Sequence, residues 1–196
     1  MRVLIVLLSL LSMPAFAADP HAGHAQHRAT AATAADHGDS LFHLDAEWDD
    51  HRGDTLSLDD LRGHPVVLVM FYGNCTTACP ILVQDAKRLD AMLPDDVRED
   101  TRFVLVSFDT VTDTPDRLRT YAASHAVDDA RWYFLSGERA QVRALAMLLG
   151  VQFHDTGNGM FDHSNLITVL DRDGRIAHRV EGLMQPMDAA AAALAR

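Results

Sequence analysis

The sequence predicts an α/β domain in which helices flank a central mixed sheet. Residues 66–72 form an unbroken, valine-rich apolar run, which is typical of a strand buried on both faces. Gly73-Asn74 interrupts this run, and apolar residues at helical spacing follow it. A second buried strand is expected at 103–108. This alternation of strand, helix and strand indicates the α/β class.

The remaining elements follow from the same signals in chain order. Residues 40–48 and 55–61 predict a small hairpin, or a strand followed by a helical turn. Leu82, Ala86, Leu89 and Leu93 share one helical face, and that helix should end before Pro94. We then expect a helix starting at Thr114-Pro115, a strand at 132–135 and a helix at 139–149 ended by Gly150. An extended segment at 151–154 and a loop at 155–159 should follow. The chain should end with strands at 165–170 and 175–180 and a helix from Met187. This order predicts a thioredoxin-like fold with an N-terminal hairpin extension.

The first 17 residues have the pattern of a secretory signal peptide. Arg2 precedes an apolar segment at 3–11, and Ala15-Phe16-Ala17 provides a small-residue cleavage site. We expect cleavage near Ala18 and a soluble protein exported to the periplasm. The alternative is an uncleaved segment that anchors the protein to the inner membrane, facing the periplasm.

Residues 18–39 are rich in Ala, Thr and His and have no apolar periodicity, which predicts a disordered tail. Its histidines, His21, His24, His27 and His37, either collect divalent metal or are incidental to a spacer. The folded domain would therefore span residues 40–196.

Composition sets limits on the partners. The chain has 17 basic and 28 acidic residues and a formal charge of −11, which excludes nucleic acid and anionic lipid as expected partners. No stretch after the signal sequence is apolar enough to cross a bilayer.

The two cysteines, Cys75 and Cys79, occupy the predicted turn between the first core strand and its helix. Their spacing puts both sulfurs on one side of the turn, and the positive end of the helix favours thiolate. Such a pair can hold a soft metal, cycle as a dithiol, or do both. A structural disulfide is the alternative, but it would close a very short loop in a domain with a large core.

Three motifs in order resemble the Sco (SenC) family of copper proteins. They are Gly73-Asn74-Cys75-Thr76-Thr77-Ala78-Cys79-Pro80, the segment from Asp109 to Asp113-Thr114-Pro115, and Asp162-His163-Ser164. The resemblance implies a thioredoxin fold, copper held by Cys75, Cys79 and His163, and a role in assembling the copper centre of a respiratory oxidase. Such a ligand set suits both Cu(I) and Cu(II), because thiolate favours the cuprous ion and imidazole the cupric ion.

Several neighbouring residues have open roles. Asp162 either orients His163 or begins a strand, and Asp109 and Asp113 either lie near the cysteine turn or serve as caps. Met160 is expected to pack rather than to bind metal. The family pattern has proline and aspartate after the first cysteine, where this chain has Thr76 and Thr77, and a basic residue where it has Thr112.

Two functions of different classes are consistent with these residues. The first is a copper metallochaperone that passes copper to a subunit of a respiratory oxidase and also meets other periplasmic copper chaperones or thiol reductants. The second is an enzyme, a thiol–disulfide oxidoreductase that reduces the cysteines of a copper-receiving partner, with Cys75 as nucleophile and Cys79 as the second thiol. Residues 157–165 contain no proline, unlike thioredoxin-type oxidoreductases, which favours copper. A copper or redox sensor is a third reading.

Overall fold

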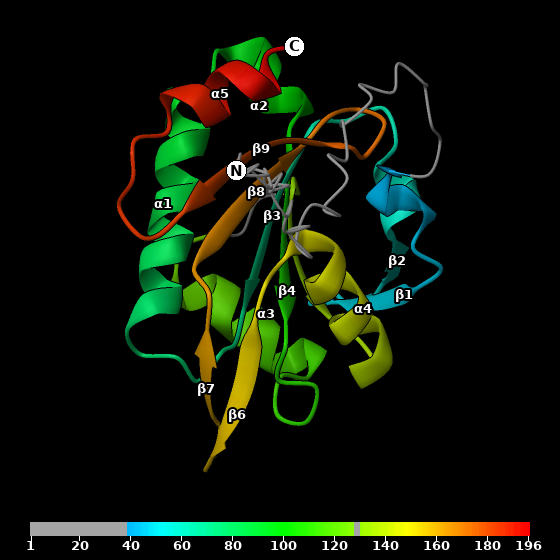
Figure 1. The fold of residues 1–196 in the computed structure, drawn as a ribbon, viewed down its shortest axis with the longest axis vertical. Coiled ribbons are helices and arrows are strands. Elements are labelled where there is room, and N and C mark those ends of the chain that lie inside the picture. The colour runs from blue at the N-terminus through cyan, green and yellow to red at the C-terminus, as the bar shows by residue number, and fades with distance from the viewer. Residues whose placement is uncertain (1–38, 128–129) are drawn as a thin grey trace, which may run out of the picture. The chain divides into compact units, whose positions relative to one another are not determined.

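The structure is a computed structural model, and it describes residues 39–127 and 130–196 (Figure 1). The predicted signal peptide and all four histidines of the predicted tail lie outside the described residues.

A seven-stranded mixed sheet forms the centre of the domain, in the order β2-β1-β5-β4-β3-β8-β9. Its strands are β1 (Glu47–Asp50), β2 (Thr55–Ser57), β3 (Val66–Phe71), β4 (Arg102–Ser107), β5 (Trp132–Ser136), β8 (Leu166–Leu170) and β9 (Ile176–Glu181). Strand β3 runs parallel to β4 and antiparallel to β8. The predicted N-terminal hairpin is β1–β2, and it extends the sheet through antiparallel pairing of β1 with β5.

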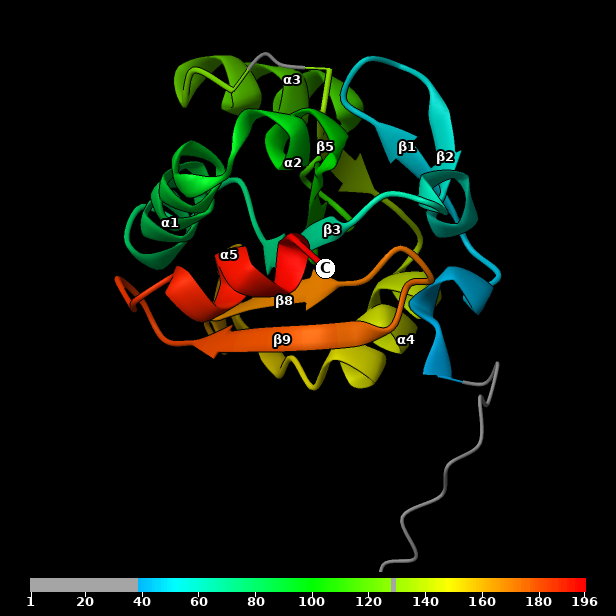
Figure 2. The same ribbon diagram turned by 90° about the horizontal axis from the view of Figure 1, so that it is seen from above.

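Helices cover both faces of this sheet (Figure 2). They are α1 (Ala78–Met92), α2 (Asp95–Asp100), α3 (Pro115–Ser124), α4 (Arg139–Leu149) and α5 (Asp188–Leu194), with 3₁₀ turns at Leu41–His43 and Leu58–Leu61. Helices α1, α3 and α5 lie on one face and α4 on the other. This arrangement confirms the predicted thioredoxin-like α/β fold.

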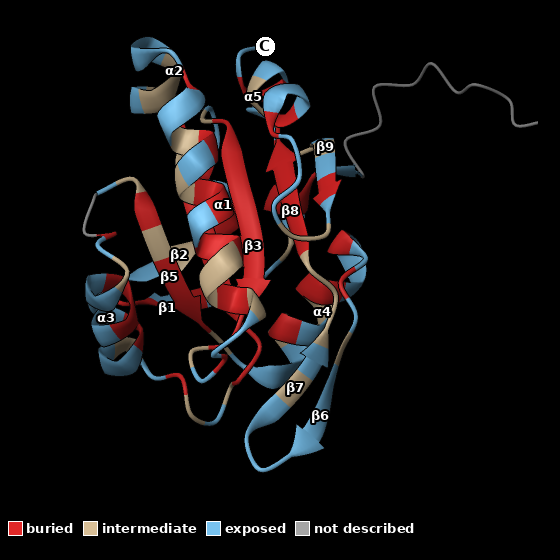
Figure 3. Ribbon diagram, turned by 90° about the vertical axis from the view of Figure 1, so that its left-hand side faces the viewer, coloured by how far each residue is buried: buried red, intermediate tan, exposed pale blue. Residues whose placement is uncertain are grey.

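The local signals explain why these helices begin and end where they do. Thr114 is the N-cap of α3, with Pro115 in the first turn, and its side chain accepts a hydrogen bond from the Arg117 N–H. Helix α4 ends at Gly150, which has the left-handed conformation at φ 75° that glycine adopts without strain. Strand β3 is buried along its whole length, as its apolar composition predicts (Figure 3).

One predicted feature was wrong and one element was missed. The segment expected to be a loop at 155–159 is largely part of a separate hairpin, β6 (Phe153–Gly157) with β7 (Met160–His163), which projects from the sheet (Figures 1 and 3). It is polar and mostly exposed, so it carries no apolar alternation by which to recognise it. Helix α2 was not predicted either, because none of its residues is buried.

In the described part of the chain, the helices all fall short of the length and hydropathy that a bilayer-spanning segment requires.

Candidate metal centre

The first cysteine lies in a tight turn at the end of β3. Strand β3 delivers the chain to Tyr72, and the Cys75 N–H donates to the Tyr72 carbonyl at 3.3 Å, which closes the turn. Gly73 and Asn74 form its corner. Cys75 is buried, with 6% of its surface exposed, and its thiol is free.

The second cysteine lies in the first turn of α1. The Cys79 backbone N–H donates to the Cys75 sulfur at 3.3 Å, so the start of the helix points one of its otherwise unpaired donors at that sulfur. Cys79 is completely buried and also free. The turn and the helix start therefore bring the two thiols together without a disulfide, as their spacing predicts.

The third residue comes from the other end of the domain. His163 is the last residue of β7, and its Nε2 lies 3.6 Å from the Cys79 sulfur. One ligand atom from each of Cys75, Cys79 and His163 lies within 4.8 Å of the other two. The structure thus brings together the three residues that the family resemblance implied.

The histidine is oriented by its own backbone neighbour. His163 Nδ1 lies 3.1 Å from the Ser164 carbonyl oxygen. A carbonyl only accepts hydrogen bonds, so Nδ1 carries the proton and the Nε2 lone pair faces the sulfurs. Asp162 is exposed on the outer face of β7. The Ser164 carbonyl, and not Asp162, therefore orients the His163 ring.

Aromatic rings hold the imidazole in place. The His163 ring centroid lies 5.8 Å from that of Tyr72 and 5.2 Å from that of Phe108. Phe161, on the same hairpin, contacts both of these rings. Sequence reasoning treated Tyr72 as an ordinary core residue and missed this aromatic support, since no sequence signal connects residues so far apart in the chain.

The two thiols have opposite electrostatic surroundings. Burial raises the pKa of the Cys75 thiol, but hydrogen bonds from the Cys79 and Thr77 backbone, together with that of the Cys79 side chain, outweigh burial and lower this pKa to about 6. Burial raises the pKa of Cys79 well above its ordinary value, and the adjacent Cys75 raises it further. At neutral pH the pair is therefore a thiolate beside a thiol.

A buried aspartate supports the cysteine turn from behind. The Asp113 carboxylate accepts hydrogen bonds from the Gly73 N–H at 2.7 Å and the Ser107 hydroxyl at 2.6 Å. Burial raises the pKa of Asp113 despite these two donors. Asp113 thus lies against the turn, whereas Asp109 accepts hydrogen bonds from the backbone N–H groups of Val111 and Thr112.

Met160 does not pack as predicted. It lies on β7 with 47% of its surface exposed.

Known proteins resemble this chain over most of the described domain. The family model described as SCO1/SenC matches residues 34–196. A Stutzerimonas stutzeri protein named only provisionally as copper-binding is 28% identical over 131 residues, covering 65% of this chain and 63% of that protein. The SCO1 protein homolog of Bacillus subtilis (strain 168) is 24% identical over 134 residues, covering 67% of this chain and 69% of that protein. The matched region thus spans about two thirds of each of these relatives.

Solved structures share the fold. Bradyrhizobium japonicum ScoI with copper bound has a TM-score of 0.60 and 25% identity, covering 76% of this chain and 95% of that one. A SCO1/SenC family lipoprotein from Bacillus anthracis str. Ames has a TM-score of 0.69 and 20% identity, covering 76% and 90%. The SCO1/SenC model matches far more than half of this chain, and this chain therefore belongs to the SCO1/SenC family.

Proposed function

We propose that this protein is a periplasmic copper metallochaperone that binds copper through Cys75, Cys79 and His163. The observation that carries the proposal is the convergence of these three side chains, with their ligand atoms within 4.8 Å of one another. Export to the periplasm rests on the signal-peptide pattern of the first 17 residues.

The chemistry of the three ligands suits copper in both oxidation states. Two sulfurs favour Cu(I), and the imidazole nitrogen adds affinity for Cu(II). The Cys75 thiolate and the Nε2 lone pair are ready to bind, whereas Cys79 must lose its proton when the metal enters. A structural zinc site normally has four protein ligands, and this cluster offers three among the described residues.

The receiving partner is proposed to be the copper-site subunit of a respiratory oxidase. The support is family membership, together with one structural neighbour, BsSco, that is described as a member of the Sco family of cytochrome c oxidase assembly proteins. Of the three ligands only His163 is partly exposed, so a partner's ligands can reach the site from that side and replace the three one at a time.

An anaerobic copper titration of the reduced protein tests this function. Wild type should bind about one Cu(I) or one Cu(II) per chain at the cysteines, since the described residues hold one such set of three ligands. Replacing both cysteines with serine should abolish tight binding of either ion. His163→Ala should weaken Cu(II) much more than Cu(I), and equal binding of both ions by this variant would remove the histidine from the site.

The unequal thiols favour a second candidate, a thiol–disulfide oxidoreductase. The Cys75 thiolate would attack a partner's disulfide, forming a mixed disulfide and releasing one partner thiolate. Cys79, after passing its proton to His163 Nε2 at 3.6 Å, would attack the Cys75 sulfur and release the second partner thiolate. Two electrons pass to the partner, and this chain is left with a Cys75–Cys79 disulfide that an external thiol must reduce.

Disulfide turnover distinguishes this enzyme from the chaperone. If the oxidoreductase operates, metal-free protein should reduce a model peptide disulfide catalytically in the presence of a thiol reductant, and Cys75→Ser should abolish turnover. Stoichiometric copper binding without disulfide turnover would rule out the oxidoreductase and support the chaperone.

A further inference from the structure

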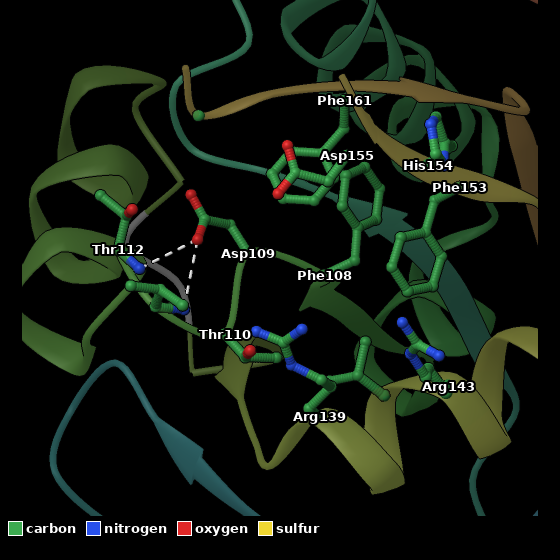
Figure 4. Close-up of a pocket in the computed structure, with 13 residues that line it drawn as sticks. Phe108, Asp109, Thr110, Thr112, Arg139, Arg143, Phe153, His154, Asp155 and Phe161 are labelled. Atoms are coloured by element: carbon green, nitrogen blue, oxygen red, sulfur yellow. Dashed lines mark hydrogen bonds between the residues drawn. The ribbon is translucent and has the colours of Figure 1, made fainter. Parts of the chain in front are cut away.

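A pocket of about 430 Å³ is lined by residues of the β6–β7 hairpin, of α4 and of the segment that follows β4 (Figure 4). Phe108, Phe153 and Phe161 give it an aromatic wall, with Phe108 and Phe153 stacked at 5.0 Å. Such a pocket favours an apolar side chain.

Two arginines one helical turn apart line the same pocket. Figure 4 shows Arg139 and Arg143 projecting from α4 beside the phenylalanines. Neither side chain makes an ion pair or hydrogen bond with any residue in the described ranges, whereas most other arginine side chains there have a carboxylate or carbonyl partner. Arg139 is also the first residue of α4, where the helix dipole disfavours a positive charge. Helix stability therefore does not account for it.

The two carboxylates of the pocket are each held through one oxygen by backbone N–H groups. Asp155 Oδ1 accepts from the Gly157 N–H at 2.7 Å, and Asp109 Oδ1 accepts from the Thr112 N–H at 2.9 Å. Asp109 Oδ2 is buried without a hydrogen-bond partner among the described residues, and neither carboxylate forms an ion pair with Arg139 or Arg143 there. The pocket thus presents an apolar wall with two cations available for anionic groups.

The pocket shares a wall with the metal centre. Phe108 contacts the His163 ring at 5.2 Å and also lines the pocket. Phe153, Gly159 and Phe161 belong to the hairpin that carries His163. An occupant of the pocket would therefore touch the element that holds the third ligand.

We propose that this pocket docks the copper-receiving protein by taking an aromatic or large aliphatic side chain flanked by acidic residues. The apolar side chain lies against the three phenylalanines, and the carboxylates bind Arg139 and Arg143. Val111 on the rim is apolar and 76% exposed, so a protein surface covers it whereas a small molecule leaves it in water. This inference rests on the proposed copper-carrier function, because the partner that must reach His163 is the receiver of its copper.

The test uses N-acetyl-Glu-Phe-Glu amide as the probe and ¹⁵N-labelled, reduced, metal-free protein. Backbone amide signals of Phe108, Val142 and Phe161 should shift on titration, together with the ring signals of His163. The double variant R139Q/R143Q should bind the peptide about tenfold more weakly, because it loses two charge-assisted contacts. R179Q is the matched control, since Arg179 is exposed on β9, lacks a partner among the described residues and does not line the pocket. It should bind like wild type.

Comparison probes exclude other occupants. N-acetyl-Lys-Phe-Lys amide should bind much more weakly than the acidic peptide, and phenylacetate should bind more weakly than either. Equal binding of the basic peptide, tighter binding of phenylacetate, or unchanged affinity in R139Q/R143Q would overturn the proposal. Dimerisation in sedimentation runs that R139Q/R143Q abolishes would assign the pocket to a second copy of the chain and would overturn it as well.

Copper titration of the same samples distinguishes failure of this docking proposal from failure of the proposed copper-chaperone function. R139Q/R143Q should keep wild-type copper stoichiometry. Copper binding without peptide binding overturns the pocket assignment alone. Peptide binding without copper binding overturns the chaperone function, and with it the identity of the docked partner.

Discussion

Cys75 and Cys79 have the same side chain, but their surroundings favour the thiolate at Cys75 and the protonated thiol at Cys79. Cys75 receives hydrogen bonds from the start of α1, which stabilise its thiolate. Cys79 has no exposed surface and lies beside that negative charge, which stabilises its protonated form. The pair is therefore reactive at one sulfur and protected at the other.

This difference predicts the pH dependence of alkylation. In the reduced, metal-free protein, iodoacetamide should modify Cys75 first, at a rate that rises with pH through a midpoint near 6 and then levels off, because the thiolate is the nucleophile. Cys79 should stay unmodified over the same range. The measurement is mass-spectrometric peptide mapping after timed quenching. A single midpoint near 9 shared by both cysteines would contradict the assignment.

At this scale local spacing along the chain identified the cysteines but not their histidine. Both cysteines fall at a strand-to-helix turn that apolar pattern and glycine made visible. His163 lies 84 residues from Cys79, on a polar hairpin with no periodic signal. The family resemblance, and the position of His163 just before the strand predicted at 165–170, pointed to it instead. A long-range contact of this kind leaves no trace in local spacing.

Among the elements, the β6–β7 hairpin determines whether the site is complete. Most of its residues are exposed, and its inward side chains rest on Tyr72 and Phe108. Few buried contacts hold it, so its position should respond to small changes in this aromatic packing.

Removing one of these rings should loosen the third ligand. We expect Phe161→Ala to speed amide hydrogen exchange across 153–163 and to weaken Cu(II) more than Cu(I), because the cysteines stay in place. Met160→Ala on the exposed side of the same strand is the control and should change neither. Hydrogen-exchange mass spectrometry and copper titration measure the two effects. Identical behaviour of the two variants would rule out aromatic anchoring of the hairpin.

The cysteine turn makes a second element-scale prediction. A Cβ at Gly73 would lie 2.7 Å from the Asp113 Oδ1, and the Asp113 carboxylate is held by two hydrogen bonds. Gly73→Ala should therefore lower the free energy of unfolding by about 1–3 kcal/mol, the usual cost of overpacking.

A double-mutant cycle in urea denaturation checks the cause. Asp113→Ala removes the clashing carboxylate, so the combined variant should be less destabilised than the sum of the two single changes. Strict additivity would show that the clash is not the source of the loss.

The sequence predicted elements well where burial leaves a periodic pattern. Helix α1 has the expected inner face, and the caps of α3 and α4 lie at the expected residues. Helix α2 and the β6–β7 hairpin were missed because their polar residues give no apolar period. The missed hairpin is also the element that brings the third ligand.

Across the whole molecule, the metal centre joins parts that the chain keeps far apart. The β3–α1 turn and the β6–β7 hairpin meet only in the folded state, whereas the two cysteines remain near each other in sequence when the chain unfolds. Copper should therefore favour the folded state mainly through the contribution of His163.

This linkage predicts a change in thermal stability. Under anaerobic conditions, Cu(I) in excess should raise the Tm of the reduced wild-type protein, because the folded state binds the ion more tightly than the unfolded chain. The increase should be clearly smaller for His163→Ala. Differential scanning calorimetry measures it, and equal increases in both proteins would mean that the cysteine pair alone accounts for binding.

The most direct test of the central claim is X-ray absorption spectroscopy of the copper-loaded protein. The control variant replaces His21, His24, His27 and His37 with alanine, so that only the folded domain can supply imidazole close to the cysteines. In that variant the Cu(I) and Cu(II) forms should both show two sulfur ligands and one imidazole, and the imidazole should vanish in His163→Ala. A copper shell without sulfur, or an imidazole that persists after His163→Ala, would contradict the three-ligand site.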